Sequence, residues 1–235
     1  MNRRPKKTGT RPFIFINMAM TADGKIASAN RAVSSFGSQR DRAHLYELRA
    51  TADAVICGAR TVETEAATLG PGGEKFQRRR QENSLAEYNL RVIVTGSGSI
   101  NPKAAIFKPR FSPIIVLTTQ RISAQQLKQL REVADEVKIL GETEINFRQA
   151  VTWLRRKWKV KRLLCEGGGE LNGALFQAGL IDQIHLTICP KVFGGRTAPS
   201  IADGEGFAQL DWAEKFKLDS AKRIKGELFT VFSRR

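Results

Sequence analysis

One stretch of this chain indicates both a fold and a binding site, Leu163-Leu164-Cys165-Glu166-Gly167-Gly168-Gly169-Glu170-Leu171-Asn172-Gly173-Ala174-Leu175-Phe176. A short apolar run ends in one carboxylate, three glycines follow, and an amphipathic pattern then predicts a helix. Glycine lacks Cβ, so its backbone can approach a ligand closely. The free N–H groups and the dipole at the start of a helix favour an anion such as a phosphate or pyrophosphate. The stretch therefore predicts a nucleotide site, with Glu166 at the end of the strand.

Strand and helix patterns alternate on both sides of this stretch. Apolar runs typical of strands buried on both faces are followed by periodic patterns typical of helices. This alternation predicts an α/β fold with a mostly parallel central sheet, helices on both faces and an antiparallel C-terminal edge. The expected strands lie at 13–19, 54–57, 91–94, 114–117, 137–140, 184–189, 216–218 and 228–232, with another ending at 166; the expected helices lie at 41–50, 147–158, from 60, from 169 and from an N-cap at Ser123 to 133, and 70–90 is expected to be an exposed loop.

Length and composition favour a single domain. The chain has 235 residues, of which 41% are hydrophobic, and it shows no internal linker or repeat. We expect residues 1–11 to form a disordered basic tail and residues 12–235 to form the domain. No apolar run approaches a membrane span or a signal peptide, and Cys57, Cys165 and Cys189 are scattered in apolar runs. These features predict reduced core thiols and a cytoplasmic protein.

The net charge of +16 allows two kinds of partner. A basic body suits phosphorylated small molecules, and it also suits loose contact with nucleic acid. The chain lacks an RNA-binding motif and lacks aromatic residues interleaved with basic ones, so nucleic-acid binding is the less favoured hypothesis. A basic surface that only promotes solubility is the favoured explanation for most of the charge.

Several catalytic classes have no motif here. The only histidines, His44 and His185, have no ligand spacing with another histidine or with cysteine, so no metal site is predicted. The chain has no Gly-x-Ser-x-Gly elbow and no P-loop. A Rossmann fingerprint is also disfavoured, because the glycines follow a late strand and have the wrong spacing. The phosphate-binding argument does not depend on that fold.

Other strand ends support a dinucleotide site. In open α/β sheets, ligands bind outside the carboxyl ends of the strands. Gly58 and the segment around Thr61 and Val62 form a second strand-glycine-helix entry, and Thr95 comes directly after an apolar strand. Each of these could be an ordinary strand-to-helix turn, but together they predict one shared crevice.

Taken together, these segments resemble the reductase family of riboflavin biosynthesis, whose fold is like that of dihydrofolate reductase. The likeness runs from about residue 12 to the C-terminus. It is closest to the stand-alone archaeal and fungal type, because the zinc deaminase signature is absent. The matching segments are Asn17-Met18-Ala19-Met20-Thr21-Ala22-Asp23-Gly24-Lys25-Ile26-Ala27, Leu48-Arg49-Ala50, Gly58 through Val62, Glu166-Gly167-Gly168-Gly169 with Asn172, and Cys189-Pro190-Lys191-Val192-Phe193-Gly194-Gly195 through Ala198-Pro199 to Asp203-Gly204-Glu205-Gly206-Phe207.

The resemblance implies an enzyme that uses NADPH to reduce a phosphoribosylamino-pyrimidine to its ribitylamino form, by hydride transfer to ribose C1′. It also implies a homodimer. Residues that match cofactor contacts of the family are Ala19, Ser35, Thr61, Glu65, Gly168, Gly169, Glu170, Leu171, Asn172, Gly173 and Ala174; residues that match substrate contacts are Val33, Arg49, Leu69 and Glu166. Arg49 suits the substrate phosphate or a ring carbonyl. Glu166 suits substrate orientation first, and proton donation to the imine nitrogen second.

The chain departs from the family pattern in its substrate half. Many members carry Asp-Asp-Pro-x-Leu-Thr-x-Arg, where this chain has Glu65 through Gly72 with one acid and no arginine. Tyr46 stands where a histidine is usual. A substrate before deamination (the diaminopyrimidinone), one after it (the aminouracil), or another pterin-like or pyrimidine compound therefore all remain open.

Overall fold

The computed structural model describes residues 9–32, 34–64 and 67–235. Its elements confirm every strand expected from the sequence, and they add one helix that was not expected. In chain order they are β1 (Phe13–Thr21), α1 (Gln39–Arg49), β2 (Ala54–Gly58), α2 (Ala59–Thr64), α3 (Glu74–Glu82), β3 (Leu90–Val94), the 3-10 turn η1 (Ala105–Phe107), β4 (Ile114–Thr118), α4 (Ala124–Val133), β5 (Glu136–Ile139), α5 (Phe147–Lys157), β6 (Arg162–Cys165), α6 (Gly169–Gln177), β7 (Gln183–Cys189), the 3-10 turn η2 (Leu210–Trp212), β8 (Phe216–Ile224) and β9 (Glu227–Arg234).

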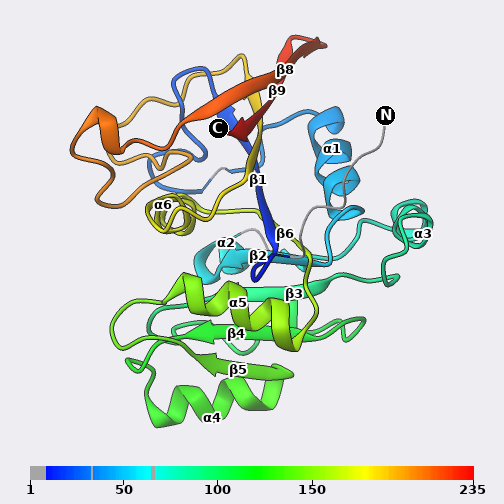
Figure 1. Cartoon of the computed structure of the whole chain (residues 1–235), viewed down its shortest axis with the longest axis vertical. Coiled ribbons are helices and arrows are strands. Elements are labelled where there is room, and N and C mark those ends of the chain that lie inside the picture. Colours follow the sequence, from blue (N-terminus) through cyan, green and yellow to red (C-terminus); the bar gives the residue numbers. More distant parts are fainter. Residues whose placement is uncertain (1–8, 33, 65–66) are drawn as a thin grey trace.

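One sheet of nine strands runs through the molecule in the order β5-β4-β3-β2-β6-β1-β7-β9-β8. All pairings from β5 through β7 are parallel, whereas β9 is antiparallel to β7 and to β8. The hairpin between β8 and β9 turns at Lys225 and Gly226, which both have positive φ, as a tight two-residue turn requires. The expected antiparallel C-terminal edge is confirmed, and Figure 1 shows it at the end of the sheet opposite β5.

Helices cover both faces of the sheet because successive side chains of its central strands alternate between two apolar clusters. Ile14 and Ile16 of β1 belong to the cluster that α5 and α6 cover. Phe15 lies between them in the sequence and belongs to the cluster that α1, α2, η1 and α4 cover. The strands are therefore buried on both sides, which explains why they appear as nearly continuous apolar runs.

The expectation of an exposed loop over 70–90 is wrong, because α3 forms over 74–82. The helix is polar on nearly every side, so its sequence gives no amphipathic signal. One turn of it is nevertheless anchored: the buried Arg80 guanidinium donates to the carbonyls of Arg49, Ala52 and Ala86. Burial lowers the pKa of Arg80 to about 10. A buried arginine holds this segment against the end of α1.

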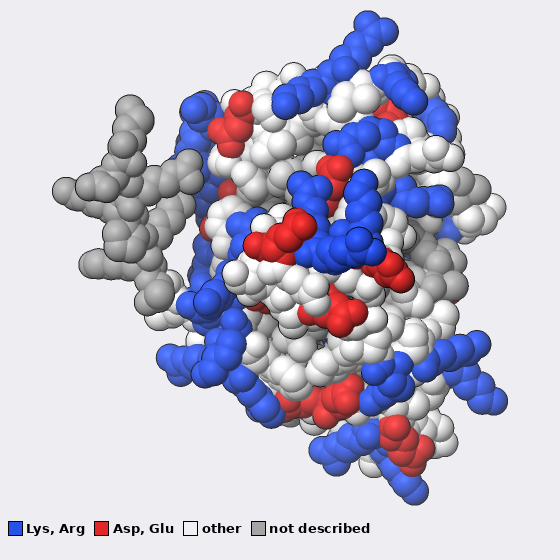
Figure 2. Space-filling view, turned by 90° about the vertical axis from the view of Figure 1, so that its right-hand side faces the viewer, with Lys and Arg blue, Asp and Glu red and all other residues white. Residues whose placement is uncertain are grey.

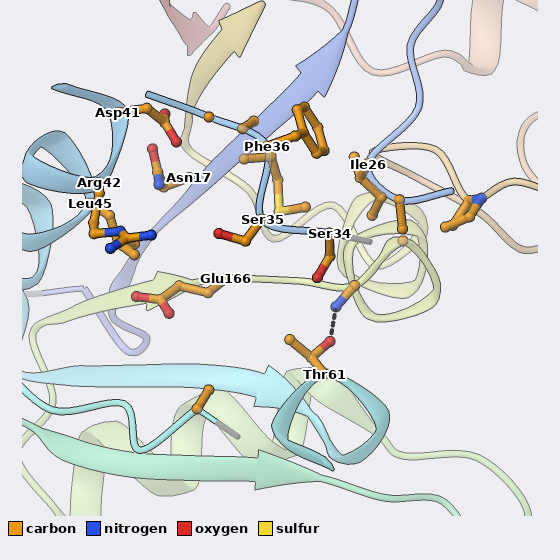
Figure 3. Close-up of a pocket in the computed structure, with 18 of the residues that line it drawn as sticks. Asn17, Ile26, Ser34, Ser35, Phe36, Asp41, Arg42, Leu45, Thr61 and Glu166 are labelled. Atoms are coloured by element: carbon orange, nitrogen blue, oxygen red, sulfur yellow. Dashed lines mark hydrogen bonds between the residues drawn. The ribbon is translucent and has the colours of Figure 1, made fainter. Parts of the chain in front are cut away.

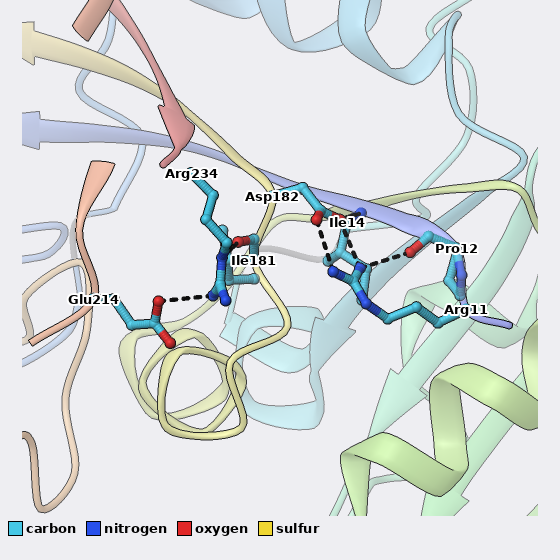
Figure 4. Close-up of polar contacts among 7 residues, drawn as sticks. All are labelled: Arg11, Pro12, Ile14, Ile181, Asp182, Glu214 and Arg234. Atoms are coloured by element: carbon cyan, nitrogen blue, oxygen red, sulfur yellow. Dashed lines mark hydrogen bonds and ion pairs between the residues drawn. The ribbon is translucent and has the colours of Figure 1, made fainter. Parts of the chain in front are cut away.

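Two arginines fix the ends of the chain on either side of the turn that precedes β7 (Figure 4). Arg11 donates through both terminal nitrogens to Asp182 at 2.7 Å, and Asp182 also accepts from the Ile14 amide. Arg234 donates to the carbonyl of Ile181 and pairs with Glu214 at 2.9 Å. Arg11, the last residue of the expected tail, is thus attached to the sheet, and residues 1–8 lie outside the described residues.

Cys57, Cys165 and Cys189 are all buried, and none of them forms a disulfide within the described residues. Burial raises the pKa of Cys165 to about 12, and the pKa of Cys189 is raised to about 12 by burial and by the charge of Glu227. Within the described part of the chain, no helix is long and apolar enough to span a membrane. Figure 2 shows Lys and Arg side chains in several groups on one face, with Asp and Glu between them.

Candidate functional site

Two adjoining cavities open at the carboxyl ends of the central parallel strands. The first, the α1-side cavity, measures about 230 Å³ and lies between β1, α1 and Glu166. The second, the α6-side cavity, measures about 800 Å³ and lies between the ends of β2 and β3 and the start of α6. The residues that line both are Arg31, Arg60, Thr61, Gly168 and Gly169. The glycine turn therefore separates two parts of one crevice.

Glu166 forms a closed ion pair with Arg49 in the α1-side cavity. Nε and Nη2 of Arg49 donate to the two carboxylate oxygens at 2.6 Å each, and Nη1 donates to the Gly70 carbonyl at 2.5 Å. Both side chains are nearly buried, with 8% and 10% exposed. Burial by itself would lower the pKa of Arg49, but the charge and hydrogen bonds of Glu166 raise it. Glu166 is therefore held in one orientation, and this favours an orienting role over proton donation.

The glycine turn connects β6 to α6 and is fixed by α2. Gly167 has φ of +78°, a left-handed conformation that favours glycine, and the peptide between Gly167 and Gly168 is cis. The Gly168 amide donates to Thr61 Oγ1 at 3.1 Å, the contact drawn in Figure 3. Further along, the first-turn amides of α6 have no partner within the helix. They form part of the wall of the α6-side cavity, where an anion is favoured.

Two of the predicted cofactor glycines, Gly169 and Gly173, pack against the segment 200–203. A Cβ on Gly173 would meet the backbone carbonyl of Asp203, and one on Gly169 would meet the Asp203 side chain and the Ser200 carbonyl. The Asn172 side chain lies in the same contact, because its Nδ2 donates to the Ile201 carbonyl at 2.8 Å. Gly169 still lines both cavities, whereas Gly173 and Asn172 line neither.

The remaining predicted residues divide between the cavities and the core. Val62 is fully buried in the apolar cluster beneath α2 and reaches neither cavity, because a helix entry turns every third or fourth side chain inward. Val33 and Glu65 lie outside the described residues. Ala19, Ser35, Arg49 and Leu69 line the α1-side cavity, and Gly58, Thr95, Glu170, Leu171 and Ala174 line the α6-side cavity.

The α1-side cavity contains two polar groups that sequence reasoning missed. Asn17 of β1 is only 7% exposed, and its Oδ1 has no hydrogen-bond partner in the structure. Asp41 of α1 has an unpartnered Oδ1 as well, and its pKa is raised by burial and by the charge of Glu227, although a hydrogen bond from Thr187 opposes the shift. Figure 3 shows both side chains on the same wall. Asn17 could have been found from the sequence, because a polar residue within a buried strand is unusual. No sequence feature marked Asp41 as a residue of the cavity.

Charges of both signs line the α6-side cavity, with the carboxylates of Glu144, Glu170, Asp203 and Glu205 beside its arginines. Arg31, Arg60, Arg121 and Arg148 line it, together with the hydroxyls of Ser97 and Ser99. Only Arg60 among them forms an ion pair in the described residues, a loose one with Glu170 at 3.4 Å. The cavity therefore has unpaired guanidinium groups beside a helix N-terminus, a combination that suits several phosphates.

Tyr46 and Gly72, two departures from the family pattern, lie against each other. Gly72 has φ of +94°, and a Cβ there would collide with the Tyr46 ring. The ring also lies against the Arg49 guanidinium, 5.4 Å from its centre, and packs on Phe76 of α3. Position 72 consequently has no room for a side chain of any kind. Nowhere in the described residues do three or more His, Cys, Asp or Glu side chains gather as a metal site would require.

A family model of the RibD C-terminal domain matches residues 12–229. The 2,5-diamino-6-ribosylamino-4(3H)-pyrimidinone 5′-phosphate reductase of Archaeoglobus fulgidus is 30% identical over 225 residues, covering 95% of this chain and 98% of that protein. The riboflavin biosynthesis protein RibD of Actinobacillus pleuropneumoniae is 27% identical, and this chain spans 54% of its length.

Solved structures agree on the fold. A pyrimidine reductase-like protein from Corynebacterium diphtheriae superimposes with a TM-score of 0.81 at 20% identity, over 95% of this chain and 92% of that one. Acinetobacter baumannii RibD superimposes with a TM-score of 0.74 at 19% identity, over 96% of this chain and 58% of that one. These neighbours confirm the fold expected from the sequence, and the chain belongs to the RibD C-terminal domain family, the reductases of riboflavin biosynthesis.

Proposed function

We propose that this protein uses NADPH to reduce a 6-ribosylamino-pyrimidinone 5′-phosphate to its ribitylamino form. The observation that carries the proposal is the oriented Glu166–Arg49 pair, which lies directly beside the glycine turn shared by the two cavities. A cofactor in one cavity and a pyrimidine in the other would meet at this turn. The names of the archaeal relatives support the same substrate class.

The α6-side cavity fits a phosphorylated dinucleotide. Its residues supply free first-turn amides, the Thr61 and Thr95 positions, and guanidinium groups for phosphate. Arg121 and Arg148 reach the cavity from outside the glycine turn and are candidates for the 2′-phosphate that distinguishes NADPH from NADH. When bound, the dihydronicotinamide supplies the hydride that becomes a C1′–H bond of the substrate, while solvent supplies the proton for the adjoining nitrogen.

The α1-side cavity fits the pyrimidine. Glu166 is held in place by Arg49 and orients ring amino groups or ribose hydroxyls as an acceptor. Asn17 and Asp41 add acceptor oxygens that lack partners in the structure. Buried acceptors are stabilised by donors on the ligand. A diaminopyrimidinone offers an amino group where a uracil has a carbonyl, so we expect the form that precedes deamination to be preferred.

The test is steady-state NADPH oxidation by the purified chain with the diaminopyrimidinone and aminouracil forms of the substrate, each as the 5′-phosphate. Turnover of either form supports the proposed function. A higher kcat/KM for the diamino form supports the roles of Asn17 and Asp41, and Asn17→Leu should then reduce the ratio between the two forms. Turnover of neither form, with turnover of another pterin-like or pyrimidine acceptor, would reject the proposed substrate.

Cofactor choice is tested separately. Arg121→Gln and Arg148→Gln are expected to raise the KM for NADPH roughly 10-fold and leave the KM for NADH unchanged, because a charge-assisted hydrogen bond contributes about 1.5–3 kcal/mol. Arg156→Gln, at an exposed position on α5 outside the cavity, is the matched control. Equal effects on NADPH and NADH would show that these arginines do not contact the 2′-phosphate.

We also propose that the protein is a homodimer joined through the β8 end of the sheet. β8 is an edge strand, and large apolar side chains are exposed near it: Leu218 on the strand, and Phe207, Leu210 and Trp212 in the segment before it. An exposed apolar patch beside an open edge favours association. Sedimentation of the wild type and of Leu210→Asp tests this, and a monomeric wild type would contradict it.

A further inference from the structure

Among the described arginines that line the α1-side cavity, Arg42 differs from the others in its surroundings. Four arginines line this cavity, Arg31, Arg42, Arg49 and Arg60. Arg49 is closed on Glu166 and on the Gly70 carbonyl. Arg31 and Arg60 also line the α6-side cavity, where phosphates of a dinucleotide would compete for them. Arg42 lines the α1-side cavity and not the α6-side cavity.

Arg42 lies on the face of α1 that forms the cavity wall. Leu45 and Arg49 follow it at spacings of three and seven residues, which places all three on one side of the helix. Its side chain is exposed and takes part in no ion pair or side-chain hydrogen bond within the described residues. Figure 3 shows it extending from α1 toward the space bounded by Ser35 and Glu166.

The segment around position 72 supplies no arginine to the α1-side cavity. Position 72, where many family members carry an arginine, is closed to any side chain by the Tyr46 ring. That ring lies in turn against the Arg49 guanidinium and against Phe76. Within the described residues, the arginines available to an anionic group in the α1-side cavity are therefore those on α1, together with Arg31 and Arg60.

We propose that Arg42 binds the 5′-phosphate of the substrate. The inference rests on the proposed function, since it presumes a phosphorylated ligand in the α1-side cavity. A guanidinium with no partner in the protein binds a phosphate dianion without first breaking an ion pair. Arg49, for which the sequence suggested the phosphate or a ring carbonyl, is already paired with Glu166.

The experiment compares the 5′-phosphorylated substrate with the same compound lacking the phosphate. For wild type, kcat/KM should be higher with the phosphate. Arg42→Gln should lower kcat/KM for the phosphorylated compound by roughly 10- to 100-fold, the range expected for one charge-assisted contact, and leave the dephosphorylated compound within about 2-fold. Arg42→Lys should fall between them, because an ammonium keeps the charge but loses the bidentate fork.

Arg40→Gln is the matched control. Arg40 lies on the same helix, and its substitution removes the same charge. Unlike Arg42, it pairs with Glu47 at 2.8 Å and does not line the cavity. The preference of the Arg40→Gln variant for the phosphorylated compound should equal that of wild type. If Arg40→Gln loses the preference as much as Arg42→Gln does, the effect is one of overall charge and the proposal is overturned.

Binding of ribose 5-phosphate, measured by calorimetry against ribose, gives a readout that needs no turnover. Wild type should prefer the phosphate, and Arg42→Gln should lose that preference while keeping its melting temperature. If Arg42→Gln keeps the full preference in either assay, Arg42 does not bind the phosphate, although the proposed function stands. If wild type reduces neither compound, the proposed function fails, and the calorimetric comparison alone decides whether Arg42 forms a phosphate site.

Discussion

The backbone carbonyl of Asp203 occupies the position that a Cβ on Gly173 would take. The loop that carries Asp203 therefore lies directly on α6, and the Asp203 amide donates to the Gly169 carbonyl at 2.9 Å. The segment 200–203 thus supports the helix whose first turn forms part of the wall of the α6-side cavity. This contact explains why α6 contains Gly173 in its interior, although a glycine there lowers helix stability by about 1 kcal/mol relative to alanine.

We expect Gly173→Ala to destabilise the protein despite its better helix propensity. Overpacking against a rigid carbonyl costs about 1–3 kcal/mol, which outweighs a propensity gain of about 1 kcal/mol. Thermal unfolding should show a melting temperature lower by a few degrees. The control is Gly96→Ala, because Gly96 has no atom near the added methyl group and no positive φ. Equal melting temperatures for the two variants would contradict the packing argument.

Glu166→Gln should damage both activity and stability. The carboxamide can accept only one of the two Arg49 hydrogen bonds, and a nearly buried guanidinium is left without its counter-charge. We expect kcat/KM to fall roughly 100-fold, as small misplacements at a site do, and the free energy of unfolding to fall by about 3–5 kcal/mol. Denaturant titration and steady-state kinetics measure the two effects.

The double variant Arg49→Met with Glu166→Leu separates those effects. Replacing a buried pair by apolar side chains is often neutral for stability, so the free energy of unfolding should return toward the wild-type value. Activity should stay low because the orienting carboxylate is absent. Recovery of activity in the double variant would show that Glu166 acts only through stability. Glu74→Gln, which breaks an exposed pair with Arg78, should change neither property.

His185 should make the protein sensitive to acid. Burial lowers the pKa of His185 from 6.5 to about 4, and the charges of His44 and Arg162 add to the shift. A lowered pKa means that the folded state favours the neutral ring. The resulting stability is present above pH 6.5 and is lost as the pH falls toward 4, with a total of at most about 3 kcal/mol.

His185→Phe should flatten this dependence. The phenyl ring can keep the contacts with Phe15 and His44, whose ring centres lie 6.0 and 5.6 Å away. The free energy of unfolding, measured between pH 7 and pH 4, should fall less steeply than in wild type. A residual slope is expected from His44, because burial lowers the pKa of His44 too. An unchanged slope would exclude His185 as the cause.

Asp41→Asn should stabilise the protein at neutral and alkaline pH. Burial and the charge of Glu227 raise the pKa of Asp41, so the folded state favours the protonated carboxyl. Stability is therefore fully present below the ordinary pKa of aspartate, about 4, and is lost as the pH rises through the raised pKa. The asparagine variant should melt higher than wild type at pH 8 and equally at pH 4. Asp211→Asn, at an exposed position, is the control.

The sequence by itself determined the order of the strands and of every helix except α3, together with the glycine turn and the family. Strands such as Phe13–Thr21 are buried on both faces, and a continuous apolar run records that burial directly. Glu166 and Arg49 could be named from motifs, since both belong to local segments that match the family. Nothing in the local sequence, however, revealed that these two side chains bind each other.

Only the tertiary structure decided which residues face the cavities and which pack elsewhere. Gly173 and Asn172 stand in the same motif as Gly168, yet they contact the distant 201–203 segment. The polar helix α3 is held by the buried Arg80, and Tyr46 closes position 72. Each of these outcomes depends on contacts between residues far apart in the chain. Local propensity and periodicity report only the backbone state and the buried face of a segment, so they contain no record of its partner.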